Sequence, residues 1–136
     1  MSIANRLPLP IRWFVPLGWT LVILYMTLST GNNQNVSWVS KMAGGTEITD
    51  AIGHLVMFTV LVVLWHWAGS SYYPTVTVLK GVTLLCFLFG MSVEASQYWI
   101  EGRGMSWLDF LANGGGVLLG ARWILYQLQK DKGGIK

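Results

Sequence analysis

Residues 77–99 read TVLKGVTLLCFLFGMSVEASQYW, with no charged side chain between Lys80 and Glu94. A helix needs about 20 residues, at about 1.5 Å of rise per residue, to cross the hydrocarbon core of a bilayer. The stretch is therefore predicted to form a membrane-spanning helix. Glu94 lies several residues inside it, so its carboxyl group either needs a partner in the protein interior or stays protonated.

Three more stretches are similarly apolar, at residues 13–29, 50–67 and 108–128, the last interrupted by Arg122. Together they predict an all-α polytopic membrane protein, a compact bundle of four transmembrane helices in one domain over residues 1–136. The first stretch, preceded by Arg6 and Arg12, also resembles a cleaved signal peptide, but no small-residue cleavage site follows it, which favours a retained helix. A short interfacial helix is expected at about 36–42.

The composition supports a membrane protein. Of 136 residues, 53% are hydrophobic and 11% charged, whereas a soluble domain has about a quarter charged; mean hydropathy is +0.49. A net charge of +3 is too small and too dispersed for a nucleic-acid partner. The single Cys86 excludes an intrachain disulfide and a Cys-based metal site.

The positions of the cations predict the orientation, because Lys and Arg in short loops stay on the cytoplasmic side during insertion. With both termini cytoplasmic, only Lys41 and Arg103 lie outside. The cytoplasmic set is Arg6, Arg12, Lys80, Arg122, Lys130, Lys132 and Lys136. His66, near the inner face, is expected to direct its polar tip to the surface.

Small residues recur every four positions in the fourth stretch, at Ala112, Gly116 and Gly120. Such a stripe lets two helix backbones approach closely in a membrane. Packing within the bundle is the favoured interpretation, and an oligomer formed through these residues is the alternative.

Polar residues gather at three helix ends and one loop that the topology places near the outer face. They are Asp50, His54, Glu94, Gln97, Arg103, Ser106, Asp109 and Asn113. Ionisable groups at membrane depth usually face the bundle interior or a water-filled cavity and pair with one another. We therefore expect these eight side chains to share a pocket.

Simpler structural roles compete with a pocket. Asp50 and Asp109 each fit a capping or first-turn acid, favoured by the helix dipole. Arg103 fits a salt bridge to Glu94 or Asp109 that ties down the outer loop. No strict metal-ligand motif such as H-E-x-x-H occurs, so neither a metal nor another cofactor is expected.

The order and spacing of these residues resemble the VanZ-like family of small bacterial membrane proteins. The resemblance covers about residues 46–121 and rests on Asp50-x-x-x-His54, Glu94-x-x-Gln97, Gly102-Arg103, Ser106, Asp109, Asn113 and Gly116. Ala51 follows Asp50 where the family commonly has Lys. The resemblance implies a multi-pass protein of the bacterial cytoplasmic (inner) membrane. The founding member is linked to low-level teicoplanin resistance, which implies a possible cell-envelope role.

The leading functional hypothesis is an outer-leaflet pocket that binds membrane lipid, another amphiphile or a lipid-linked envelope component. Arg103 would meet a phosphate or carboxylate, and His54 and Gln97 would supply hydrogen bonds. The three acids, Asp50, Glu94 and Asp109, would hold Arg103 and the imidazole in place. The chain is then a binding protein rather than an enzyme.

Two alternatives remain open. A membrane enzyme acting on a lipid-linked phosphate or ester would use His54 as general acid or base oriented by Asp50, with Glu94 a further catalytic candidate. In another form of that hypothesis, His54, Glu94 and Asp109 hold a divalent metal. A purely structural bundle would instead act through a partner protein.

Overall fold

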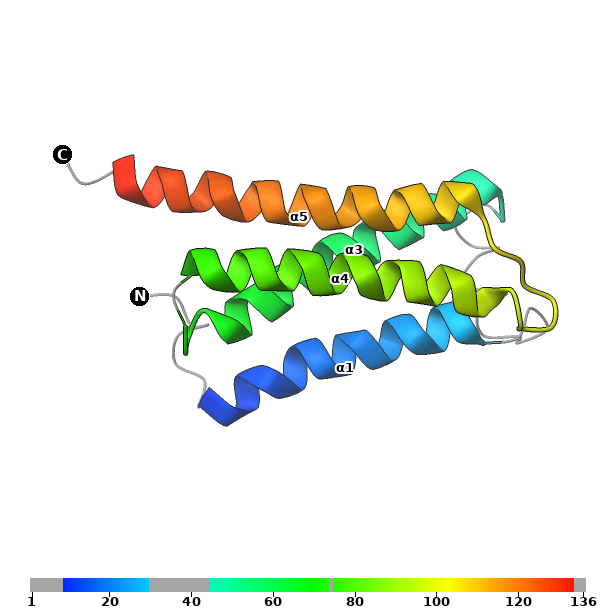
Figure 1. Ribbon diagram of the computed structural model, residues 1–136, viewed down its shortest axis with the longest axis horizontal. Coiled ribbons are helices and arrows are strands. Elements are labelled where there is room, and N and C mark those ends of the chain that lie inside the picture. Colours follow the sequence, from blue (N-terminus) through cyan, green and yellow to red (C-terminus); the bar gives the residue numbers. More distant parts are fainter. Residues whose placement is uncertain (1–8, 30–44, 74, 134–136) are drawn as a thin grey trace.

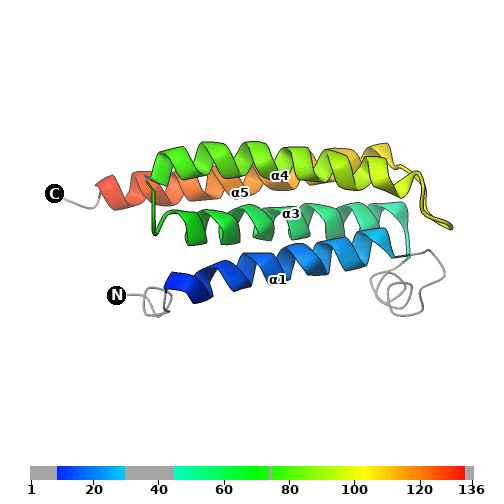
Figure 2. The ribbon, with the colours of Figure 1, turned by 60° about the horizontal axis from the view of Figure 1, so that its bottom comes forward.

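The computed structural model describes residues 9–29, 45–73 and 75–133 and contains four helices within them. These are α1 (Leu9–Leu28), α3 (Glu47–Gly69), α4 (Thr75–Gln97) and α5 (Trp107–Gly133). They lie side by side as a bundle in which successive helices run in opposite directions (Figures 1 and 2). The helix expected at 36–42 lies outside the described residues.

The observed helices confirm the four predicted helical stretches, with shifts of a few residues at most ends. Three of them, α1, α3 and α4, are long and apolar enough to cross a membrane by length and composition. The longest helix, α5, is not among these three, and its first half carries Asp109, Asn113 and three consecutive glycines. The fold is thus an all-helical bundle with three span-like helices.

Helix α3 contacts α1, α4 and α5, and its contact with α5 is the most extensive between any two helices of the described residues. Its fully buried Phe58, Leu61 and Val62 pack with Ile23 of α1 and Val117 of α5. Large apolar side chains also cover the outside, among them Phe14, Leu21, Leu85 and Leu118. A helix that is apolar on all sides is typical of a membrane environment, where lipid replaces water around the protein.

Small residues allow α5 to pack directly on the backbone of α3. A Cβ atom added to Gly116 would lie 2.3 Å from the carbonyl oxygen of Leu55, and one on Gly120 would lie 2.9 Å from that of Thr59. The Thr59 hydroxyl donates to the carbonyl oxygen of Gly116 at 3.1 Å. The small-residue stripe therefore serves packing within the chain, as favoured from the sequence. An oligomer through these residues stays a prediction.

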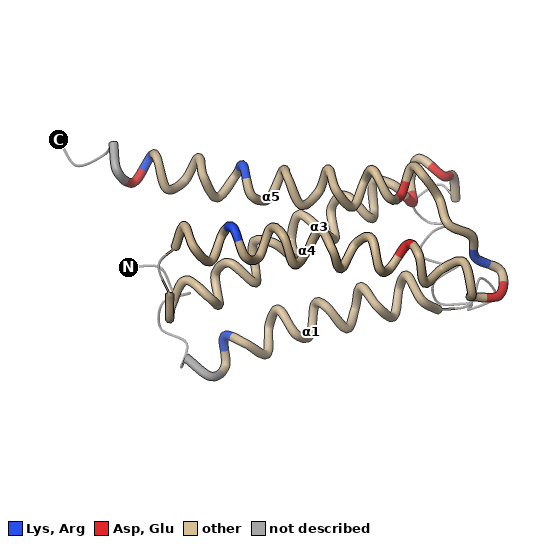
Figure 3. Tube along the Cα trace, viewed as in Figure 1, with Lys and Arg blue, Asp and Glu red and all other residues tan. Residues whose placement is uncertain are grey.

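Charges of opposite sign gather at opposite ends of the bundle (Figure 3). Where α1 and α4 end and α3 and α5 begin, the helix ends and the α4–α5 loop carry five acids with Arg103; this end is called the polar end below. The acids are Glu47, Asp50, Glu94, Glu101 and Asp109. The opposite end carries Arg12, Lys80, Arg122, Lys130 and Asp131.

Candidate functional site

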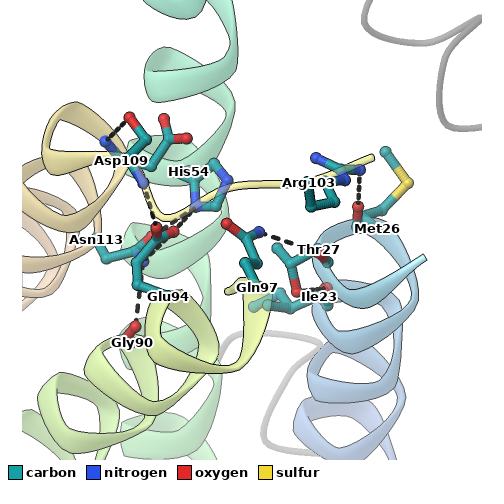
Figure 4. Close-up of polar contacts among 11 residues, drawn as sticks. Ile23, Met26, Thr27, His54, Gly90, Glu94, Gln97, Arg103, Asp109 and Asn113 are labelled. Atoms are coloured by element: carbon teal, nitrogen blue, oxygen red, sulfur yellow. Dashed lines mark hydrogen bonds and ion pairs between the residues drawn. The ribbon is translucent and has the colours of Figure 1, made fainter. Parts of the chain in front are cut away.

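Side chains from three helices converge inside the polar end (Figure 4). His54 of α3 is 5% exposed, Glu94 of α4 is 1% exposed and Asn113 of α5 is 2% exposed. Together with Asp109, one turn before Asn113 on α5, they are called the polar cluster below. Its members come from segments up to 59 residues apart in the chain.

Asn113 joins the three helices. Its Oδ1 atom lies 2.8 Å from Nδ1 of His54, and its Nδ2 donates to Oε1 of Glu94 at 3.5 Å and to the carbonyl oxygen of Gly90 at 3.4 Å. Because the amide nitrogen faces two acceptors, the amide oxygen faces the imidazole, which must donate through Nδ1–H. In the neutral ring the lone pair is then on Nε2.

Glu94 lies against His54 and against the start of α5. Its Oε1 atom is 3.7 Å from Nδ1 of His54, and its Oε2 accepts from the backbone N–H of Ser106 at 3.3 Å. Free N–H groups and the helix dipole make a helix N-terminus favourable for a carboxylate. The partner that Glu94 was expected to need is therefore supplied by three neighbours, His54, Asn113 and Ser106.

Ser106 caps α5. Its hydroxyl oxygen accepts from the backbone N–H of Asp109 at 3.3 Å, and its carbonyl oxygen accepts from that of Phe110 at 3.0 Å. This is the N-cap geometry that serine favours. The hydroxyl is committed to the helix start, which makes Ser106 a positioning residue for Asp109 and Glu94.

Asp109 contributes the second carboxyl group of the cluster. Its Oδ1 atom is buried and has no hydrogen-bond partner in the described part of the chain. The carboxyl group interacts with the Ser106 side chain through a hydrogen bond and electrostatically with His54, Asp50 and Arg103. One ligand-type atom from each of His54, Glu94 and Asp109 lies within 4.8 Å of the others.

Asp50 and Asp109 are first-turn acids, and neither is the N-cap of its helix. The N-cap of α3 is Thr46, which forms a capping box with Thr49, so Asp50 is a first-turn acid and not the cap. Its one-turn spacing from His54 does not make it the partner of Nδ1, which Asn113 occupies.

Arg103 does not form the expected salt bridge to Glu94 or Asp109. Its Nε and Nη2 atoms donate to the backbone carbonyl oxygens of Ser29 and Met26, at 3.2 and 3.0 Å. Gly102, with φ of 74°, turns the loop so that Arg103 lies over the end of α1. Arg103 binds there because the last carbonyl groups of a helix lack partners within the helix and can accept from its guanidinium group.

Gln97 also turns toward α1 and away from the polar cluster. Its Nε2 donates to the carbonyl oxygen of Thr27 at 3.0 Å, and the side chain is 2% exposed. That carbonyl group is freed because α1 ends within the next turn. Gln97 and Arg103 thus join α4 and its loop to α1.

Gly90 is a site residue that sequence reasoning missed. Its carbonyl oxygen accepts from Asn113, and a Cβ atom at this position would lie 3.0 Å from the Phe58 ring and 3.1 Å from Cβ of Asn113. Its position four residues before Glu94 places both on one face of α4, which is the signal that could have indicated it.

His66, at the opposite end, was expected to direct its polar tip to the surface. This prediction is wrong, because the residue is buried, with 9% of its surface exposed. At the same end, the Arg12 guanidinium lies 5.5 Å from the Trp67 ring centroid and donates to the Ser71 hydroxyl. These contacts hold the start of α1 against the α3–α4 turn.

An apolar cavity of about 240 Å³ lies between α1, α3 and α4. Its lining residues are Thr20, Leu61, Trp65, Val82, Leu85, Cys86 and Phe89. It does not include any member of the polar cluster, so it is not the polar pocket that was expected.

The fold and site define a small helical membrane protein with a buried polar cluster at one end. Residues 11–129 match the VanZ/LLP1 family model, so the chain belongs to the VanZ-like family. No curated protein and no solved structure is similar enough to match. The match extends the region of resemblance, 46–121, toward both termini.

Proposed function

We propose that this VanZ-like protein binds the anionic headgroup of a membrane amphiphile or lipid-linked envelope component at its polar end, in the outer leaflet of the bacterial cytoplasmic membrane. The observation that supports this is the meeting of three features at one end: the buried polar cluster, the cation Arg103 and a group of exposed aromatic side chains.

The groups that hold Arg103 in place do not neutralise its charge. Its two hydrogen bonds go to backbone carbonyl oxygens, which carry no net charge. A guanidinium group fixed in this way keeps its positive charge and its affinity for phosphate or carboxylate. Among the described residues of the polar end, it is the one Lys or Arg side chain that could attract an anionic headgroup.

Exposed aromatic residues flank Arg103 in the sequence. Trp99 is 77% exposed, Trp107 is 70% exposed, and Tyr98 packs edge-on against Trp99 with ring centroids 5.6 Å apart. Trp and Tyr are enriched at the headgroup level of membranes. They would set the depth of the polar end so that Arg103 and the cluster beneath it reach the headgroups.

The distribution of charge supports the orientation. Arg12, Lys80, Arg122 and Lys130 belong to the opposite end, which the positive-inside rule assigns to the cytoplasm. The polar end then faces outward, where envelope components are assembled. In this topology all four helices cross the membrane, including the 27-residue α5, whose length of about 40 Å is sufficient.

The test compares Arg103→Gln with Arg122→Gln, a matched loss of one guanidinium at the opposite end. Binding of phosphatidylglycerol, with phosphatidylcholine as competitor, is measured by native mass spectrometry on protein of equal folded fraction. We expect Arg103→Gln to weaken the preference for phosphatidylglycerol at least fivefold and Arg122→Gln to leave it unchanged. Equal weakening in both variants, or in neither, would contradict the proposal.

A cellular assay extends the test to the envelope. Expression of the wild type in a teicoplanin-sensitive bacterium is expected to lower its susceptibility, and Arg103→Gln is expected to lose this effect. Loss of the effect together with unchanged phosphatidylglycerol binding would instead favour the structural alternative, in which a partner protein acts. The bonds of Gln97 and Asn113 to backbone carbonyls favour that second candidate.

A further inference from the structure

The polar cluster brings two carboxyl groups, those of Glu94 and Asp109, close together. In the described residues 9–29, 45–73 and 75–133, neither Glu94 nor Asp109 has a Lys or Arg within ion-pair distance, and the one ion pair is His54 with Glu94. Glu94 is 1% exposed, so water does not solvate its carboxyl group. Buried carboxylates are stable when they are paired or when they coordinate a metal.

The unpartnered Oδ1 of Asp109 is an independent sign of a missing ligand. A buried acceptor without a donor is costly, and its partner can be an ion. The α5 N-cap holds Asp109 in the first turn, where its carboxyl group interacts with His54.

The three residues have the donor set of a transition-metal site. Imidazole nitrogen and carboxylate oxygen together suit Zn²⁺ and neighbouring first-row divalent cations. Their ligand-type atoms lie within 4.8 Å of one another. Ligand bonds of about 2.0–2.2 Å require separations of at most about 4.4 Å, so a small rotation of the carboxylates closes the shell.

Asn113 completes the arrangement from outside the ligand set. It accepts from Nδ1–H of His54 and so leaves the Nε2 lone pair for a cation. A ligating histidine typically donates its other N–H to a carboxylate or carbonyl group, which fixes the orientation of the ring. Binding through Nε2 would keep the bond to Asn113 intact, and it requires the Glu94 carboxyl group, whose Oε1 lies 3.7 Å from Nδ1, to turn toward Nε2.

We infer that His54, Glu94 and Asp109 bind one divalent transition-metal cation, with Zn²⁺ as the best fit. Three protein ligands leave a coordination position open, as in zinc sites that take water or substrate as the fourth ligand. The bound cation neutralises the two carboxylates, and its open coordination position can take a phosphate oxygen as a ligand. This role of the cation at the headgroup rests on the proposed function. The metal site itself does not depend on that proposal.

The first experiment measures metal binding alone. The full-length protein in detergent is stripped with a chelator and titrated with Zn²⁺, Mn²⁺ and Mg²⁺ by calorimetry. We expect one Zn²⁺ per chain, bound more tightly than Mg²⁺, and at least a tenfold loss of affinity in His54→Gln and Asp109→Asn. The matched controls, His66→Gln at the opposite end and Glu101→Gln in the adjacent loop, should bind as the wild type does.

Thermal unfolding shows whether a variant that fails to bind Zn²⁺ is still folded. Zn²⁺ is expected to raise the Tm of the wild type and of both controls, because it binds the folded state, and to leave that of Asp109→Asn unchanged. Zn²⁺ binding by the wild type that is no stronger than binding by Asp109→Asn would overturn the metal site.

The second experiment separates the site from the proposed function. Phosphatidylglycerol binding is measured with added Zn²⁺ and with chelator. Dependence on Zn²⁺ in the wild type, lost in His54→Gln, supports the role of the cation at the headgroup. If the protein binds Zn²⁺ but its affinity for phosphatidylglycerol is the same with Zn²⁺ and with chelator, the role of the cation at the headgroup is overturned and the metal site stands. Phosphatidylglycerol binding without any Zn²⁺ site overturns the metal inference and leaves the proposed function standing.

Discussion

The Oδ1 atom of Asn113 on α5 lies 2.8 Å from Nδ1 of His54 on α3, in an interior where both side chains are buried. This contact makes the imidazole a donor on one side and frees its other nitrogen. Through the amide nitrogen of Asn113 the same residue reaches α4 at Gly90 and Glu94. One side chain therefore links three helices by hydrogen bonds.

Replacing Asn113 with Leu is expected to destabilise the fold by about 1–3 kcal/mol, because it leaves the buried Nδ1 of His54 without its acceptor and removes a donor from the Glu94 carboxyl group. The free energy of unfolding in detergent micelles measures this. Ser92→Ala is the control: Ser92 is exposed and bonds only a carbonyl of its own helix, so its effect should stay within about 0.5 kcal/mol. An Asn113→Leu variant as stable as the wild type would show that the bonds do not contribute.

Gly116→Ala should separate α3 from α5. The added Cβ would lie 2.3 Å from the carbonyl oxygen of Leu55, a backbone atom that cannot rotate away, and overpacking of this kind costs about 1–3 kcal/mol. Gly115→Ala is matched in position and chemistry, but its Cβ would lie 3.8 Å from Cδ1 of Leu55. The control should be neutral or more stable by up to about 1 kcal/mol, the difference in helix propensity. Equal unfolding midpoints for the two variants would refute the close approach.

Arg103→Gln should loosen the last turn of α1, since the carbonyl oxygens of Met26 and Ser29 lose their donor. Hydrogen exchange at the Thr27, Leu28 and Ser29 amides is expected to accelerate by about tenfold, corresponding to the 1.5 kcal/mol or so of a charged hydrogen bond. The same amides in Arg122→Gln should exchange at the wild-type rate. Unchanged exchange in Arg103→Gln would mean that the bonds to α1 do not stabilise its end.

Ser106→Ala should weaken the start of α5 by about 0.5–2 kcal/mol, the usual cost of removing an N-cap. Ser106→Thr keeps the hydroxyl and should recover most of the loss, as seen in the free energy of unfolding. If Thr is as destabilising as Ala, the hydroxyl has a role other than the cap.

The helical stretches, the charge asymmetry and the polar residues at the helix ends could all be predicted from the sequence. Helical spacing places Glu94 and Gln97 near each other on α4, but it does not reveal which neighbouring helix each one faces. In the structure Glu94 faces α3 and α5, whereas Gln97 faces α1. A shared pocket for all eight residues was therefore too broad a prediction.

Local sequence determined which segments are helical and apolar, because both properties depend on residues within a few turns of one another. Only the tertiary structure decided that His54 pairs with Asn113 and Glu94, and that Arg103 binds carbonyl groups of α1. Asn113 lies 59 residues and Glu94 lies 40 residues from His54 along the chain, and Arg103 lies more than 70 residues from its partners in α1. Their meeting depends on how closely α5 packs on α3 at Gly116 and Gly120, a property of two surfaces that no single helix contains.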